Sequence, residues 1–503
     1  MTFEFRVRRA LRRFLVRALV PSPGVGAAIA AFAATLGKPG NADTLWHLAI
    51  GRWILAHRAV PDISRFYYPA PAGTSYDYSW LAQAILAGAY QVLGGTGIAI
   101  LNSTAAALIF YFLYRLLERH STNMMVNFAA LCVAFLAITS HLSGRPVLFT
   151  VAFLTLEVFI LSGFVQLRRG PIWLIPPIVA LWANLHPGFV VAPLVILAFL
   201  PLGREARDRR TLALCLAATV VAVIVNPYGW RMYLMPLETA RALPILRGLS
   251  EWAGVSGWEA VVWGGLVALV TCSLCLRRQP ATLTLLVALA ALSAGVSNRN
   301  MSLFGVFVVL AVGWSLLPVL LPVLERANWV RKFDVKFEGA GGWFWVVAIP
   351  VVIGGAARLG VPLMDLEFDF SRYPAAAVSY VAGHDRPGNI FVRETWSGYL
   401  LWAMPNRKLF YDAKGGFSRE AATAHSEIVK PKANWRDVAD RYDMSTFILE
   451  RGSPLAVLLG EASGWRREYS DSLSEVFVRV PPVRAPTFGT VPGSTPDSTS
   501  EDR

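Results

Sequence analysis

An acid and a histidine stand four residues apart in the stretch NADTLWHLAIGRW, residues 41–53. In a helix, this spacing places Asp43 and His47 on one face. A carboxylate within reach of an acceptor hydroxyl can act as a general base, and a neighbouring imidazole can orient it or bind a phosphate. The plainer alternatives are that Asp43 caps the helix and that His47 stacks between tryptophans.

Five further short motifs carry polar side chains that suit an anion or a sugar. They are SGRP with Arg145, NLHPG with Asn184 and His186, NPYG with Asn226, LSEW with Glu251, and SNRN with Arg299. Fixed cations such as Arg145 and Arg299 would stabilise the negative charge that gathers on a leaving phosphate. At a helix end, an arginine can instead snorkel to lipid head groups.

The other candidates have structural alternatives too. Asn184 and His186 can hydrogen-bond a sugar or phosphate, or they can cap a broken helix whose backbone groups need partners in the membrane. Asn226 precedes a proline, a position that favours a helix terminator over a ligand. Glu251 is a candidate second acid.

The elements that must position these residues are membrane-spanning helices. Of the 503 residues, 55% are apolar and 16% are charged, and the mean hydropathy is +0.47, which excludes an ordinary soluble protein. About eleven apolar runs approach the roughly 20 residues that a span needs. They lie near 17–37, 96–117, 123–141, 146–166, 171–184, 187–202, 211–226, 258–276, 281–297, 301–323 and 342–360. The fifth and sixth are short and separated by WANLHPGFV, which predicts broken or tilted helices.

The net charge of +14 does not require nucleic acid as a partner. In a membrane protein, Lys and Arg collect in cytoplasmic loops, so their positions indicate which side of the membrane each loop faces. With a cytoplasmic N-terminus, every Arg-rich loop, including REARDRR at 204–210, falls on the cytoplasmic side. The polar motifs then all fall on the outer side, and so does everything after about residue 360. We therefore expect a multi-pass protein of the inner (cytoplasmic) membrane.

Three regions are expected from the change in composition along the chain. Residues 1–361 form the transmembrane module, with a first external loop at 38–95 that contains an interfacial helix from Asp43 to His57. Residues 362–482 form a small extracytoplasmic α/β domain, with strand candidates at 389–392, 408–412, 445–450 and 475–480. Residues 483–503, rich in Pro, Ser and Thr, form a disordered tail.

The order of the motifs resembles the GT-C superfamily of membrane glycosyltransferases, and most closely the group of bacterial protein mannosyltransferases and aminoarabinose transferases. The resemblance rests on D-x-x-W-H-L from Asp43, on Arg145-Pro146, N-x-H-x-G from Asn184, N-P-Y-G from Asn226 and Glu251-Trp252, and extends to KLFYDAKGGF in the external domain. Two departures matter. The first loop lacks the paired acids of metal-dependent members, so no metal or other cofactor is indicated, and Asp412-Ala413-Lys414 stands where Asp-Gly-Arg is expected.

The resemblance implies an enzyme of the hexosyl- or pentosyltransferase class. Such an enzyme moves a sugar from a polyprenyl phosphate to an acceptor at the outer membrane face, with the residue at position 43 as the base. The sugar and the acceptor are not specified by the sequence. Two other functions remain open: a transporter or flippase of lipid-linked saccharides, and a non-catalytic binding protein of the cell envelope. Transporters usually show repeated halves with polar groups near the midplane, and neither feature is clear here.

Overall fold

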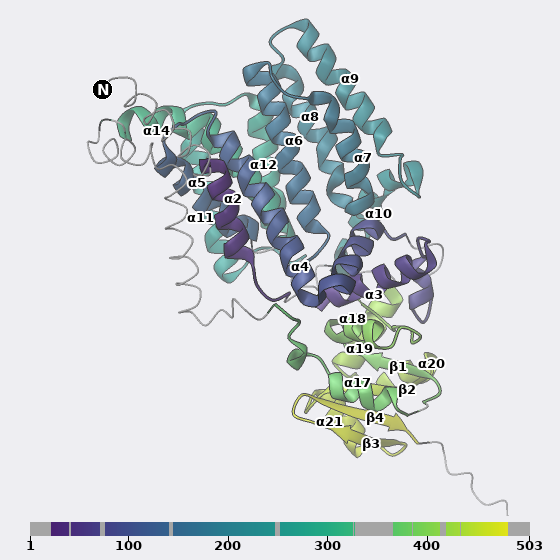
Figure 1. Cartoon of the computed structure of the whole chain (residues 1–503). Helices are drawn as coiled ribbons and strands as arrows, with labels where there is room; N and C mark the ends of the chain where they lie inside the picture. The colour runs from purple at the N-terminus through teal and green to yellow at the C-terminus, as the bar shows by residue number, and fades with distance from the viewer. Residues whose placement is uncertain are drawn as a thin grey trace, which may run out of the picture.

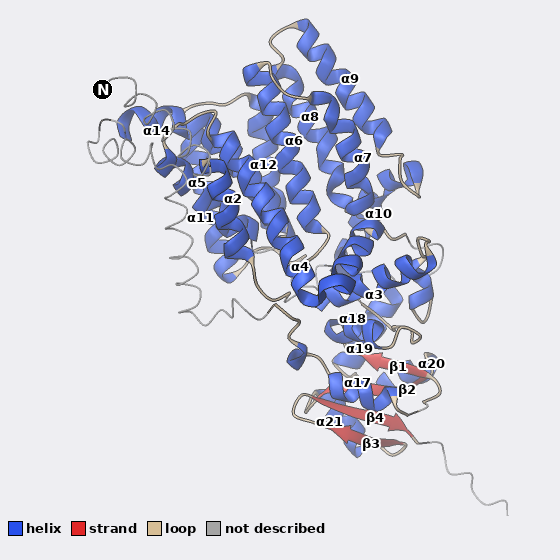
Figure 2. Cartoon of the chain, viewed as in Figure 1, coloured by secondary structure: helices blue, strands red, loops and turns tan. Residues whose placement is uncertain are grey.

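A bundle of apolar helices forms one end of the molecule, and a small α/β domain forms the other (Figures 1 and 2). The computed structural model describes residues 22–39, 42–70, 76–139, 144–246, 252–324, 326, 366–384, 386–412, 419–432 and 434–480. Glu251, the expected span at 342–360 and the expected tail lie outside the described residues.

The bundle contains ten of the eleven expected apolar runs as helices. Its helices are α2 (Pro23–Thr35), α4 (Trp80–Leu117), α5 (Met124–Ile138), α6 (Val147–Leu167), α7 (Ile175–Leu185), α8 (Val191–Phe199), α9 (Ala206–Ala222), α11 (Gly257–Leu276), α12 (Ala281–Val296), α13 (Met301–Ala311) and α14 (Leu317–Leu324). Helix α10 (Met235–Leu246) was not expected from the sequence. Among described residues, four helical stretches are long and apolar enough to cross a membrane: α4, α6, α11 and Asn298–Leu324. The count of eleven crossings therefore stays a prediction.

Two breaks in the helices have local causes. His186 adopts an extended backbone (φ −162°, ψ 142°) between α7 and the 3₁₀ turn η4 (Pro187–Val190), because a residue before proline is disfavoured in the helical region. Gly94 has φ 61° inside α4, a conformation that costs little only for glycine. This kink divides α4 into two helical parts.

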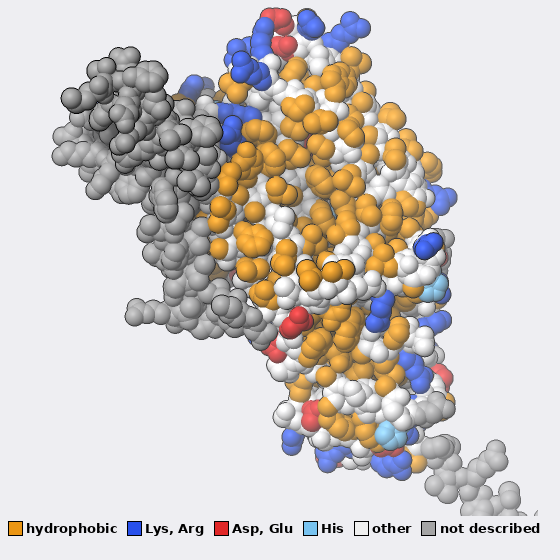
Figure 3. All heavy atoms as spheres, viewed as in Figure 1, with side chains coloured by type: hydrophobic (Ala, Val, Ile, Leu, Met, Phe, Trp, Pro, Cys, Tyr) orange, Lys and Arg blue, Asp and Glu red, His pale blue; other side chains and the backbone are white. Residues whose placement is uncertain are grey.

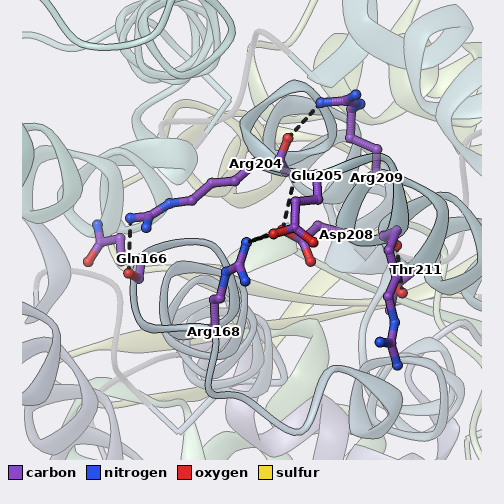
Figure 4. Close-up of polar contacts among 9 residues, drawn as sticks. Gln166, Arg168, Arg204, Glu205, Asp208, Arg209 and Thr211 are labelled. Carbon is purple, nitrogen blue, oxygen red and sulfur yellow. Dashed lines mark hydrogen bonds and ion pairs between the residues drawn. The ribbon is translucent and has the colours of Figure 1, made fainter.

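Arginine side chains gather at the end of the bundle farthest from the α/β domain, beyond a face covered by apolar side chains (Figure 3). At this end, the Arg168 guanidinium pairs with Glu205, and Arg204 donates to the Gln166 carbonyl at 3.2 Å (Figure 4). Glu205 and Asp208 form a capping box at the start of α9. The REARDRR loop thus lies beside the basic end of α6, as the positive-inside pattern expects of two loops on one side of the membrane.

The α/β domain is built on a four-stranded mixed sheet. Its order is β1-β2-β4-β3, with β1 parallel to β2 and the other pairs antiparallel. The elements are α17 (Ala375–Ala382), β1 (Asn389–Val392), α18 (Glu394–Ala403), α19 (Arg419–Val429), α20 (Trp435–Arg441), β2 (Met444–Glu450), α21 (Pro454–Glu461), β3 (Trp465–Ser470) and β4 (Ser474–Arg479). The strand expected at 408–412 is wrong. That segment makes only one isolated bridge, between Leu409 and Tyr67 of the first loop.

Helix α3 (Ala42–His57) joins the two ends of the molecule. It lies between the bundle and the α/β domain (Figure 1). Leu45 and Ile50 are fully buried in the same apolar cluster as Val392 of β1 and Leu400 of α18. The helix that carries Asp43 therefore shares its core with the C-terminal domain.

Candidate active site

Asp43 lies in the first turn of α3 and forms an ion pair with Arg145, which directly precedes α6. The Asp43 side chain is 26% exposed and the Arg145 side chain 12%, so the pair is half-buried. Coulomb attraction at this reduced dielectric favours the ionised carboxylate, which is the form that a general base needs. The acid expected as the base and a cation expected to bind phosphate therefore meet in one place.

Neighbouring residues hold this contact in register. Thr44 donates its hydroxyl to the Gly144 carbonyl at 3.5 Å, and the Gly144 amide donates to Asn102 of α4 at 3.4 Å. Gly144 has φ +68°, and a Cβ there would lie 2.8 Å from Ile98. Only glycine fits this close approach, so the turn at Gly144 brings Arg145 to α3 through a backbone conformation that another residue would distort.

His186 is buried and held by its Nδ1 atom. That atom lies 2.7 Å from the Thr150 hydroxyl and accepts the Gly188 N–H at 3.1 Å. The Thr150 oxygen itself accepts the indole N–H of Trp182 at 2.8 Å, which leaves its own hydrogen to donate to His186. With two donors at Nδ1, a neutral His186 carries its proton on Nε2.

Arg299 lies against that second ring nitrogen. One guanidinium nitrogen is 3.3 Å from His186 Nε2, and the Arg299 Cζ is 4.9 Å from the ring centre of Trp252. The guanidinium N–H of Arg299 and the Nε2–H of His186 are both hydrogen-bond donors. An oxyanion between them could accept a hydrogen bond from each. The expected phosphate ligands His186 and Arg299, which lie more than a hundred residues apart in the sequence, are thus adjacent in space.

Helix α6 links the two pairs. Arg145 pairs with Asp43, and Thr150, five residues further along the chain, supports His186. Arg145 stands two residues before Val147, the first residue of α6, and Thr150 lies in the first turn of that helix. Both pairs therefore contact residues at the N-terminal end of α6.

The two asparagines are occupied by the scaffold. Asn184 accepts the Trp80 indole N–H at 3.1 Å and donates to the carbonyls of Ala180 and Val225. Asn226 accepts the Tyr228 amide at 2.7 Å and donates to Val223. Hydrogen bonds of this kind are typical of residues that cap or terminate a helix. Both asparagines therefore fit the structural role that the sequence offered as the alternative to substrate binding.

His47 is 7% exposed and lies edge-on to Trp46, with ring centres 5.2 Å apart. Tyr373, from the segment that precedes α17, lies near Asp43. Burial and then the Asp43 charge raise the pKa of Tyr373 to about 12, so its phenol stays neutral and can donate a hydrogen bond. The α/β domain thus contributes a side chain beside the candidate base.

Asp77 and Asp412 are buried acids that were not named from the sequence as candidate site residues. Asp77 is 2% exposed and accepts from the Ser79 amide and the Gln83 side chain. Asp412 accepts the Tyr67 hydroxyl at 2.7 Å, and that hydroxyl accepts the Trp46 indole N–H at 3.2 Å. Both acids could have been identified from the sequence, because each lies in a short segment rich in aromatic residues, SYDYSW for Asp77 and KLFYD for Asp412.

Among the described residues, no group of three or more His, Cys, Asp and Glu side chains has the arrangement of a metal-ligand set. Metal dependence therefore rests on the sequence alone, where the paired acids of metal-dependent relatives are missing.

Comparison with known proteins identifies the fold. No family model and no curated protein sequence matches the chain. Sixteen chains of solved structures are similar. One is the archaeal oligosaccharyltransferase AglB from Archaeoglobus fulgidus in complex with an inhibitory peptide and a dolichol-phosphate. It has a TM-score of 0.54 at 11% identity, over 91% of this chain and 74% of that chain.

Oligosaccharyltransferases belong to the GT-C superfamily that the motif order resembles. This chain shares the fold of that oligosaccharyltransferase. The shared fold and the four long apolar helices in the described part of the chain support an integral membrane protein that is mostly helical, with a small sheet in its C-terminal part.

Proposed function

We propose that this chain is a membrane glycosyltransferase of the hexosyl- or pentosyltransferase class, with a polyprenyl-phosphate-linked sugar as donor. The observation that carries the proposal is the Asp43–Arg145 pair beside the His186–Arg299 pair. A transfer from a lipid phosphate needs a base for the acceptor and cations for the leaving group. The similar AglB structure contains a dolichol-phosphate, a lipid phosphate of this kind.

In the proposed reaction, the Asp43 carboxylate removes the proton of the acceptor hydroxyl as its oxygen attacks the anomeric carbon. The bond from that carbon to the phosphate oxygen breaks, and the phosphate leaves with the bonding electrons. Arg299 and the Nε2–H of His186 receive the developing charge, and Arg145 keeps Asp43 ionised and oriented. His47 and Tyr373 are proposed to orient the acceptor. We leave Asn184 and Asn226 out of the substrate contacts because their side-chain amides already hydrogen-bond to backbone groups. Glu251 remains a candidate for a second acid.

We further propose that reaction and α/β domain lie on the outer face of the inner membrane, with a cytoplasmic N-terminus. The basic end of the bundle would then face the cytoplasm, as the positive-inside rule requires. The transmembrane module would end near residue 361, and the extracytoplasmic domain would run from 362 to 482.

The deciding experiment compares Asp43→Asn with Asp62→Asn in cells that lack the native protein. Asp62 is an exposed acid of the same loop that caps a 3₁₀ turn. Mass spectrometry of envelope glycans and glycolipids should show the product in wild-type and Asp62→Asn cells, and a loss of about 10²–10⁴-fold with Asp43→Asn. Immunoblots of the membrane fraction should show equal amounts of the three proteins. Near-normal product with Asp43→Asn would remove Asp43 as the base.

A further inference from the structure

A second polar site, beyond the proposed function, lies on the other side of α3. Here α3, the 3₁₀ turn η1 (Ile63–Phe66) and the segment after α18 enclose a groove of about 470 Å³. Five basic side chains line it, which we call the basic groove: Arg52, His57, Arg65, Arg407 and Lys408.

The basic groove is separate from the candidate active site. Ala49, Arg52, Trp53 and Ala56 line it with the i, i+3, i+4, i+7 spacing of one helix face. At 100° per residue, this face points roughly 150° away from that of Asp43 and His47. A ligand in the groove therefore does not occupy the reaction centre.

Among the described residues, no acid balances the charge of the groove. No Asp or Glu lines it, and no ion pair in the described part of the chain includes its arginines or Lys408. Clustered like charges repel one another and concentrate counter-ions in a concave site. A bound anion would relieve the repulsion.

Some of these cations are already held in place. Arg52 donates to the Trp402 carbonyl at 2.6 Å, and Arg407 donates to the Arg386 carbonyl at 2.8 Å. The Arg65 Cζ lies 4.4 Å from the Trp53 ring centre. A guanidinium fixed by such contacts loses less side-chain entropy when it binds a phosphate or carboxylate.

From this geometry we propose that the basic groove binds a phosphate ester. Arginine forks match phosphate oxygens in pairs, and a phosphate ester, whether monoester or diester, presents a negative charge and terminal oxygens that several of these cations can share. The volume falls in the range of small-molecule sites, about 300–1,000 Å³, so it admits the group that carries the phosphate as well. Two sources share this chemistry: a phosphorylated saccharide and a phospholipid head group.

The test uses the full-length protein in phosphatidylcholine nanodiscs and isothermal titration with glucose 6-phosphate, with glucose as the neutral reference. The variant is Arg65→Gln with Lys408→Gln, two exposed positions outside the proposed reaction centre. The matched control is Arg436→Gln, an exposed arginine that lies over Trp435 in the same domain. In a second arm, nanodiscs also contain phosphatidylglycerol, and native mass spectrometry measures the lipid retained by the protein.

We expect saturable binding of glucose 6-phosphate, of phosphatidylglycerol, or of both, and no binding of glucose. The double variant should bind at least about tenfold more weakly, and the Arg436→Gln control should bind like wild type. Binding of the sugar phosphate alone assigns the groove to a saccharide, and retention of the lipid alone assigns it to a head group. Binding of neither probe, or equal binding by the double variant, overturns the proposal.

Discussion

Single residues in this protein take their roles from what they contact. Asp43 could have been a helix cap, but its carboxylate pairs with the guanidinium of Arg145, which lies in the turn before α6. His186 interrupts the helical run before a proline, and the Thr150 and Gly188 bonds then fix which ring nitrogen points toward Arg299. Asn184 and Asn226 fit their structural alternative instead.

His425 of α19 gives a prediction at this scale. It is 6% exposed, between Tyr411 and Phe391, and burial lowers its pKa from 6.5 to about 4, against a smaller opposite effect of Glu394. The Glu394 oxygen lies 3.3 Å from its Nε2 atom, but the two are not aligned as a hydrogen bond. Between these pH values the unfolded chain binds more protons, so stability should fall as pH drops from about 6.5 to about 4.

The measurement is the thermal unfolding midpoint of the full chain in detergent across that pH range. His425→Phe keeps the ring packing and should flatten the pH dependence of the midpoint, whereas His384→Gln, at an exposed histidine of the same domain, should not. An unchanged slope in His425→Phe would show that other groups cause the acid sensitivity.

At the scale of elements, glycines and prolines decide where the helices break. The apolar run from Trp80 to Leu117 could form one straight helix, but its direction changes at Gly94. The Gly95 amide then donates to Glu367 at 3.0 Å. This turn sets where α4 meets the α/β domain.

Gly94→Ala should destabilise the protein by about 1–3 kcal/mol, because the residue has φ +61° and a Cβ there would lie 2.9 Å from a Glu367 oxygen. Gly88→Ala in the same helix is the matched control, since its Cβ would meet nothing within 4 Å and alanine favours helix. Thermal unfolding in detergent compares the two. Equal midpoints would mean that the kink bends around an alanine without cost.

On the scale of the whole molecule, the α/β domain supports the helix that bears Asp43. The Tyr67 hydroxyl links Trp46 of α3 to Asp412, and backbone bonds join the first loop to Leu409. Burial and the Asp412 charge raise the pKa of Tyr67 well above its ordinary value, so the phenol remains a donor. The α/β domain therefore helps to hold α3, and with it Asp43, in position.

Tyr67→Phe should cost about 1–3 kcal/mol, because it removes a hydrogen bond to a buried carboxylate. Hydrogen exchange should quicken in α3 and in residues 408–412, and product formation should fall. Tyr90→Phe, a hydroxyl removal on α4 beside Phe368 and Trp402, serves as control. Unchanged exchange in α3 with Tyr67→Phe would show that the domain does not hold the helix.

The sequence alone determined the expectation of a membrane fold, most helix positions, the break before Pro187, and the polar motifs, because hydropathy and proline act over a few residues. It did not determine that the segment after β1 and α18 would pair with the first loop instead of the sheet, nor that Tyr373 and Asp412 would lie near α3. Only the tertiary structure decided that Asp43 meets Arg145 and that His186 meets Arg299. These contacts join residues more than a hundred positions apart, and packing between helices, which no local pattern encodes, brings them together.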